Sequence, residues 1–240
     1  LNQEQKLIRK TVKAFAEILY DYPELDAEEQ RQFLQTIIKE SERMTRLISQ
    51  VLDLEKLESG AEKIAFAPLN IRDCIRDAVE SLQQVLREKQ IKLQESYPEE
   101  LPLVNGDRDR LIQVLLNLLA NAIKFCEPEN GQIGIAATPG QQQIAISIED
   151  NGRGIPEDQR EVIFDKFYQA RNQTRKKPVG SGLGLAISKR IVELHGGTIR
   201  ARGKHAPGAV FTFSLPLAGT NHSTDSVKIN PQSFENTGSR

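Results

Sequence analysis

The sequence predicts an all-α helical hairpin followed by an α+β sandwich, in which helices cover one face of a mixed sheet. Three observations predict this order. Residues 1–58 contain no glycine and a single proline, Pro23, and their apolar residues recur at helical spacing. From residue 61 onward, short apolar runs of strand pattern alternate with helical stretches. Residues 218–240 are rich in Asn, Ser and Thr, which predicts a flexible C-terminal tail.

The first sixty residues carry two amphipathic helices. The apolar stripe of the first is Leu1, Ile8, Val12, Phe15 and Leu19. Pro23 interrupts the pattern, Asp26 can cap the second helix with Glu29 completing a capping box, and Gly60 ends it. A hairpin alone cannot bury two wide stripes, whereas two hairpins in a four-helix bundle can. We therefore expect a homodimer through residues 1–60; the alternative is packing against the chain's own second domain.

Residues 61–217 alternate strands and helices. The second domain begins with an expected strand at 63–69, a helix capped by Asn70 that reaches Leu86, and a short strand at 91–94. Residues 103–106 form a strand or turn, and a strongly apolar helix starts at Asp107 or Asp109 and ends at Phe125. The remaining elements are strands at 132–137 and 144–150, a helix that residues 188–194 close, and strands at 198–201 and 209–215.

Composition excludes several classes of protein. The 240 residues hold 32 Lys+Arg against 33 Asp+Glu, a formal net charge of -1, which argues against a nucleic-acid-binding surface. No apolar run approaches the roughly 20 residues that span a bilayer, so any membrane attachment requires sequence that is not present here. Cys74 and Cys126 are too few for a disulfide framework or a four-sulfur zinc site. We expect reduced, buried thiols and a cytoplasmic location.

The first candidate segment lies on the apolar helix before Phe125. Asn117, Asn121 and Lys124 are spaced i, i+4, i+7 and share one helix face. Carboxamide oxygens can ligate a hard cation, and an ammonium can meet a phosphate. An ordinary polar helix face remains the alternative.

Two glycine-rich segments follow. Asp150 ends a strand and leads into Asn151-Gly152-Arg153-Gly154, where a carboxylate can accept from an adenine amino group, although Asp-Asn-Gly is also a common tight turn. The second segment, Gly180-Ser181-Gly182-Leu183-Gly184, leads into a helix, and exposed N–H groups there suit a phosphate. It lacks both the dinucleotide fingerprint and the closing Gly-Lys-Ser/Thr of a P-loop.

A fourth segment lies between the two glycine runs. Phe164, Phe167 and Tyr168 can anchor a mobile segment, and the basic residues 171–178 follow them. A lid over a polyphosphate has this composition, and so does a solvated loop with a small aromatic anchor.

In this order the four segments resemble the Asn box, first glycine box, Phe box and second glycine box of sensor histidine kinases. The nucleotide-binding fold of that family is the Bergerat type, shared with type II topoisomerases, mismatch-repair ATPases and heat-shock chaperones. The resemblance covers roughly residues 1–217, and residues 52–60 resemble the second helix of the family's dimerisation and phosphoacceptor domain. It implies a hairpin domain over 1–60 and an ATP-binding domain over 61–217, with the tail at 218–240.

The resemblance also implies site roles, with ATP and Mg²⁺ as cofactors. Asn121 would ligate Mg²⁺, Asn117 and Lys124 would contact phosphates, and Asp150 would bind the adenine amino group. The full set of expected ATP-binding residues is Asn117, Asn121, Lys124, Asp150, Gly152, Gly154, Ile155, Phe164, Phe167, Gly180, Gly182, Leu183, Gly184 and Leu185. In the family, the γ-phosphoryl passes to a histidine and then to an aspartate of a response-regulator receiver domain.

The hairpin departs from the family pattern. The family carries a His-Glu-Leu-Arg-Thr-Pro-like box on the first helix, whereas the histidines of this chain are His195, His205 and His222. Without a gap, Gln3-Glu4 falls where His-Glu should be, and the acceptor has been lost. Alternatively, a stretch that carries the box is absent between Lys10 and Lys13, because the residues on both sides fit the family.

Three functions follow from these patterns. The first is the core of an ATP-dependent protein-histidine kinase. The second is a dimeric ATP-binding signalling module without its own acceptor. The third is a non-kinase Bergerat ATPase, which would need a glutamate base near Asn117, where this chain has asparagine.

Overall fold

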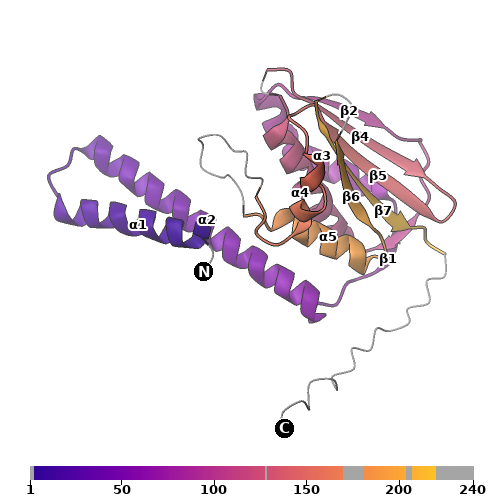
Figure 1. Cartoon of the computed structure of the whole chain (residues 1–240), viewed down its shortest axis with the longest axis horizontal. Coiled ribbons are helices and arrows are strands. Elements are labelled where there is room, and N and C mark those ends of the chain that lie inside the picture. Colours follow the sequence, from indigo (N-terminus) through magenta and orange to yellow (C-terminus); the bar gives the residue numbers. More distant parts are fainter. Residues whose placement is uncertain (1–2, 128, 170–180, 204–206, 220–240) are drawn as a thin grey trace, which may run out of the picture.

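The computed structural model describes residues 3–127, 129–169, 181–203 and 207–219. It contains an N-terminal helical hairpin and a domain of helices and strands (Figure 1). The hairpin consists of α1 (Gln3–Asp21) and α2 (Ala27–Ser59). The helices of the second domain are α3 (Ile71–Glu88), α4 (Arg108–Phe125) and α5 (Gly184–Leu194), with short 3₁₀ turns at Glu157–Gln159 and Val162–Phe164. The predicted fold class is confirmed.

Local sequence sets the boundaries of the hairpin. The Asp26 carboxylate accepts from the N–H groups of Glu28 (2.9 Å) and Glu29 (2.8 Å), as expected of an N-cap. Gly60 ends α2 with a φ of 67°, the left-handed conformation that glycine adopts without strain. Phe15 of α1 stacks on Phe33 of α2 at 5.2 Å between ring centroids. One face of α1 therefore packs against one face of α2.

The second domain is built on a five-stranded mixed sheet. Its strands are β2 (Lys92–Ser96), β4 (Gln132–Pro139), β5 (Gln143–Asp150), β7 (Ala209–Pro216) and β6 (Ile199–Gly203), in the order β2-β4-β5-β7-β6. Only the β2–β4 pair is parallel among the described strands. The helices α3, α4 and α5 lie on one face of this sheet (Figure 1).

A second, two-stranded sheet joins β1 (Ala67–Leu69) to β3 (Val104–Gly106). The expected strand at 63–69 is thus shorter than predicted, because residues 63–66 have no strand partner and lead from α2 into the domain. The helix expected to follow the second glycine run and to be closed by 188–194 is α5, which begins at Gly184. The predicted tail lies outside the described residues from 220 onward.

The end of α2 belongs to the core of the second domain. Leu54 and Leu57 are buried in the same apolar cluster as Leu118, Ile148 and Phe213. Further toward the hairpin tip, by contrast, α2 keeps large apolar side chains exposed, among them Leu34, Ile38, Ile48 and Leu52. The end of α2 therefore packs against the chain's own second domain. The rest of α2 leaves apolar side chains uncovered in the single chain, where a second hairpin could pack. Among the described helices, none is long and apolar enough to cross a membrane.

His195 is a structural residue. It is 5% exposed, its Nδ1 lies 2.8 Å from the Ile191 carbonyl oxygen, and its Nε2 accepts from the Asp107 N–H at 3.0 Å. The Asp107 carboxylate in turn accepts from the Ala65 N–H, at 3.0 Å. A neutral imidazole with its proton on Nδ1 satisfies both contacts and joins α5, the start of α4 and the segment after α2.

Because of His195, we expect the protein to be less stable toward unfolding at acidic pH. Burial lowers the pKa of His195, opposed by its hydrogen bond to Ile191 and by the charge of Asp107. Below the unfolded pKa of about 6.5 the unfolded chain binds the proton more readily, so stability is lost as pH falls through that range toward the folded pKa. We expect the melting temperature to fall between pH 7.5 and pH 5.5, and to fall less in His195→Gln. His222→Gln is the matched control; an equal effect of both variants would contradict the assignment.

Candidate functional site

The candidate site is built around α4. Asp107 caps this helix by accepting from the Arg110 N–H at 3.2 Å, and a row of leucines and Val114 buries its inner side. Asn117 and Asn121 are half-buried on the polar face, and Lys124 is exposed one turn further on. The predicted i, i+4, i+7 face therefore exists, and it runs toward the C-terminal end of the helix.

Asn117 connects α4 to the second glycine segment. Its amide Nδ2 donates to the carbonyl of Gly184 at 3.2 Å and to the hydroxyl oxygen of Ser188 at 3.3 Å. These two hydrogen bonds from Nδ2 to α5 fix the plane of the Asn117 amide. The other polar atom of the amide, Oδ1, is a hydrogen-bond acceptor. Ser188 is fully buried. Sequence reasoning missed Ser188, although its place one turn after Gly184 was a signal.

The start of α5 presents backbone donors. Leu183 precedes the helix without a side-chain cap, and its own N–H donates to Ser181 Oγ at 3.1 Å. The first N–H groups of a helix have no partner inside it, and the helix dipole adds positive potential there. Gly184 sits beside Asn117, with 3.6 Å between an added Cβ and the Asn117 amide. This end of α5 is suited to an anion held between two helices.

The first glycine segment closes on the end of α4. Asp150 is 3% exposed at the end of β5, and its Oδ1 accepts from the Gly152 N–H at 2.8 Å. A Cβ on Gly152 would lie 1.9 Å from the Phe125 carbonyl oxygen, so only glycine fits. Gly154 has a φ of 76° and passes close to the Gly208 carbonyl. The Gly152 backbone thus packs directly against the end of α4 and holds the Asp150 carboxylate beside it.

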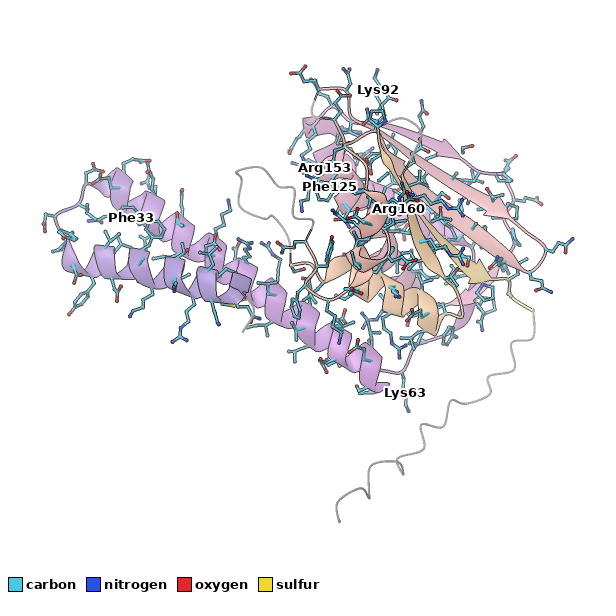
Figure 2. All side chains as sticks on the ribbon, in the orientation of Figure 1. Phe33, Lys63, Lys92, Phe125, Arg153 and Arg160 are labelled. Atoms are coloured by element: carbon cyan, nitrogen blue, oxygen red, sulfur yellow. The ribbon has the colours of Figure 1, made fainter. Side chains whose placement is uncertain are left out.

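Two cations gather over one aromatic ring at the same end of α4. Lys124 Nζ lies 4.5 Å and Arg153 Cζ 5.1 Å from the centroid of the Phe125 ring. Figure 2 shows Arg153 beside Phe125. Sequence reasoning left Arg153 out of the site, although it stands inside the glycine motif. The positive charge suits a polyphosphate.

The aromatic segment is joined to the second glycine segment. The Phe167 N–H donates to the Gly182 carbonyl at 2.9 Å. Both residues have positive φ, 62° and 67°, and a Cβ on Gly182 would lie 2.8 Å from the Tyr168 carbonyl oxygen. Phe164, expected to anchor this segment, is buried against Phe211, edge to face at 6.4 Å. Its burial gives it an anchoring role.

The remaining predicted residues differ in their placement. Leu183 is fully buried, and Ile155 and Leu185 are half-buried against the core. Gly180 and the basic run 171–178 lie outside the described residues. The described parts of the four segments therefore meet pairwise around α4 and the start of α5, although up to 67 residues separate them in the chain.

The side chains at the site could hold Mg²⁺ only together with the phosphate oxygens of a bound ligand. Within the described ranges, no three His, Cys, Asp or Glu side chains gather as metal ligands. Mg²⁺ in proteins is often held by one or two side-chain oxygens together with substrate phosphates and water. The Asn121 amide can supply such an oxygen on the same face as Asn117.

Two family models match the chain. The His Kinase A (phospho-acceptor) domain matches residues 10–60, and the histidine kinase-, DNA gyrase B- and HSP90-like ATPase matches residues 106–219. Among curated relatives, the circadian input-output histidine kinase CikA of Synechococcus elongatus is 33% identical over 191 residues, 79% of this chain and 25% of that protein. The sensor histidine kinase ZraS of Escherichia coli is 34% identical over 189 residues, 79% of this chain and 38% of that protein.

Solved structures agree with these matches. The catalytic domain of histidine kinase ThkA, nucleotide-free, is 32% identical with a TM-score of 0.57, over 64% of this chain and 98% of that one. Full-length ShkA in complex with AMPPNP is 28% identical with a TM-score of 0.68, over 90% of this chain and 45% of that one. ThkA in complex with response regulator TrrA is 27% identical with a TM-score of 0.70, over 88% of this chain and 59% of that one.

The chain spans about a quarter of the length of CikA and about two fifths of the length of ZraS. Within that span, both family models match in the order of the hairpin and the sheet domain, and the relatives share a third of the sequence. The chain therefore belongs to the sensor histidine kinase family and corresponds to its catalytic core.

Proposed function

We propose that this chain is the ATP-binding core of a protein-histidine kinase in a two-component signalling system. One observation carries the proposal: α4 brings together Asn117, the Asp150–Gly152 turn and the start of α5, from three separate parts of the sequence. These elements offer an amide, a buried carboxylate and helix N–H groups around one space. A relative of the same architecture, ShkA, has been solved with AMPPNP, an analogue of ATP.

Each group has a role in this proposal. The Asp150 oxygen not bonded to Gly152 would accept from the adenine amino group, while Gly152 and Gly154 let the base approach the backbone. Lys124, Asn117 and the first N–H groups of α5 would hold the phosphates. Asn121 would hold Mg²⁺, which neutralises phosphate charge when it is bound. Phosphoryl transfer needs mainly such positioning and charge neutralisation.

The hairpin would serve as the dimerisation domain. Exposed Leu34, Ile38, Ile48 and Leu52 lie on one side of α2, which suits a second hairpin. ThkA has been solved with the response regulator TrrA. We propose that a receiver domain also binds this protein, and that it docks on the hairpin.

The missing acceptor favours a specific second candidate. None of the three histidines stands in the hairpin, and the buried His195 is held by Asp107 and Ile191. In the gap-free register, the chain would have the proposed ATP site and no acceptor of its own. It would then bind ATP, dimerise and phosphorylate no histidine within its own dimer.

Restoring the acceptor tests both candidates. The gap-free register with the family places Gln3 at the histidine position. With γ-labelled ATP and Mg²⁺, Gln3→His is expected to gain acid-labile, base-stable phosphate that the unmodified chain lacks. Gln5→His, two residues further along α1, is the matched control and is expected to stay unlabelled. If Gln3→His binds ATP and gains no label, the kinase proposal in this register is wrong.

A further inference from the structure

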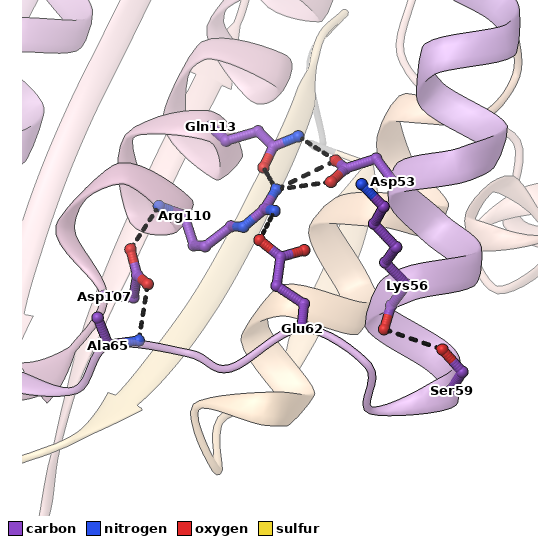
Figure 3. A network of polar contacts seen from close by, with 8 residues as sticks. All are labelled: Asp53, Lys56, Ser59, Glu62, Ala65, Asp107, Arg110 and Gln113. Atoms are coloured by element: carbon purple, nitrogen blue, oxygen red, sulfur yellow. Dashed lines mark hydrogen bonds and ion pairs between the residues drawn. The ribbon is translucent and has the colours of Figure 1, made fainter.

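The last turns of α2 contact the ATP-binding domain through a network centred on Arg110 (Figure 3). Arg110 Nη1 donates to both Asp53 carboxylate oxygens, at 2.9 and 3.1 Å, and Nη2 donates to Glu62. Gln113 Nε2 also donates to Asp53, at 2.8 Å, and its Oε1 accepts from Arg110 at 2.7 Å. We call Asp53, Glu62, Arg110 and Gln113 the Arg110 latch. It joins α2 and the segment after it to the first turns of α4.

Two further contacts also join a cationic side chain of the ATP-binding domain to an acceptor at the end of α2. Lys166 pairs with Glu58 at 2.6 Å, and Arg190 Nε donates to the Leu57 carbonyl at 3.3 Å. In each of these ion pairs and in the contact with Leu57, the cation belongs to the ATP-binding domain and the acceptor belongs to the end of α2 or to Glu62 just after it. The last carbonyls of a helix carry partial negative charge, which adds to this attraction. The interface is therefore complementary in charge and specific in orientation.

The latch is shielded from water more than an ordinary surface ion pair. The side chains of Arg110, Asp53 and Glu62 are 18%, 22% and 29% exposed. Burial lowers the pKa of Arg110, but its hydrogen bonds with Glu62 and Asp53 outweigh that effect and raise it. The guanidinium therefore stays charged, and removing it would leave two half-buried carboxylates facing each other.

The closed latch is not fully satisfied. Among the residues that the structure describes, Glu62 Oε2 is the one buried side-chain oxygen or nitrogen without a hydrogen-bond partner. A buried carboxylate oxygen without a partner costs free energy, and apolar residues could fill such an interface at less cost. The network thus defines an orientation more than it maximises stability.

Two helices connect the latch to the nucleotide motifs. Arg110 lies on the same face of α4 as Asn117 and Asn121, two turns before Asn117. On α5, Arg190 contacts Leu57 while Gly184 and Ser188, toward the other end, contact Asn117. A rotation of α4 or α5 relative to α2 would therefore move the nucleotide motifs as a unit relative to the hairpin.

We propose that Arg110 is a positioning residue: through Asp53 and Glu62 it holds the ATP-binding domain in one orientation on the end of α2, and opening the latch frees the domain to move about residues 60–64. Gly60, with its positive φ, and the exposed Ala61 provide the hinge. Leu54 and Leu57 keep the domains in contact, and the hydrophobic attraction between them and the core is itself non-directional. This inference concerns domain orientation and does not require that the site binds ATP.

A pulsed electron paramagnetic resonance measurement of the distance between two spin labels tests the proposal directly. Spin labels are attached to Gln35→Cys on the hairpin and Gln142→Cys on the sheet domain, both exposed positions. Native Cys74 and Cys126 are buried, and burial raises the pKa of Cys74 to about 11, so labels favour the introduced thiols. Labelled chain is diluted with excess unlabelled chain, so that a dimer carries one labelled pair.

The latch predicts a single narrow distance distribution that Arg110→Gln broadens. Arg108→Gln is the matched control, because the carboxylate partner of Arg108, Asp77, lies within the same domain. It is expected to leave the distribution narrow. Asp53→Asn combined with Glu62→Gln removes the latch from the other side, should Arg110→Gln fail to fold, and is expected to broaden it likewise. An unchanged distribution in a folded latch variant, or equal broadening in Arg108→Gln, would overturn the proposal.

Discussion

Replacing Asp150 by asparagine is expected to weaken ATP binding by about 100-fold or more while the protein stays folded. The Oδ1 of the new amide can still accept from the Gly152 N–H, so the glycine turn persists. Its NH₂ group replaces the oxygen assigned to the adenine amino group, and two donors then face each other in a buried place. Titration calorimetry with Mg²⁺ and ATP measures the loss.

Two further variants make this expectation specific. Asn121→Asp exchanges the proposed Mg²⁺-binding amide for a carboxylate beside the phosphates, and is also expected to lose binding. Asp73→Asn on α3, whose carboxylate pairs with Arg76 on the surface, is the matched control and is expected to bind ATP normally. Unchanged ATP affinity in both Asp150→Asn and Asn121→Asp would show that the site residues are assigned wrongly.

Introducing charge on the exposed apolar side of α2 is expected to dissociate the dimer. Ile48 and Leu52 are 49% and 55% exposed in the single chain and stand one helical turn apart. In the proposed four-helix bundle they are buried, and each substitution occurs twice in a dimer. An aspartate without a partner there costs several kcal/mol, so Ile48→Asp or Leu52→Asp is expected to raise the dimer Kd by about 100-fold or more.

Sedimentation equilibrium measures this change, since a monomer weighs 26.9 kDa. Gln35→Asp, at an exposed position on another side of α2, is the control and is expected to leave the dimer intact. A monomeric unmodified chain, or equal dissociation in all three variants, would contradict the proposed bundle. The charge variants are expected to keep their fold, because the changed side chains are not part of the core cluster.

Local patterns predicted the helices well because their signals lie within a few residues. Asp26 and Asn70 were identified as caps from sequence, and Asp107 was one of two candidate starts of its helix. Each accepts from an N–H two or three residues on. The strand β5 alternates in burial as its sequence does. The order β2-β4-β5-β7-β6 could not be predicted, because strand pairing depends on long-range contacts that periodicity does not encode.

The partners of the site residues could not be predicted in the same way. The glycine run was expected to lead into α5, but the contact between Asn117 and Gly184 joins residues 67 positions apart. Phe164 was expected to anchor its segment, but its partner Phe211 lies far along the chain and could not be named from the sequence. The partners of Arg110, Asp53 and Glu62, are 57 and 48 residues away, and no local pattern joins them.

Calorimetric titration of the purified chain with ATP and Mg²⁺ tests the central claim most directly, because every role proposed for α4, β5 and α5 depends on nucleotide binding. The predicted result is saturable binding of one nucleotide per chain that weakens when Mg²⁺ is chelated. A chain that is folded by circular dichroism and yet shows no saturable binding, or that binds ATP as tightly after Asp150→Asn, would contradict it.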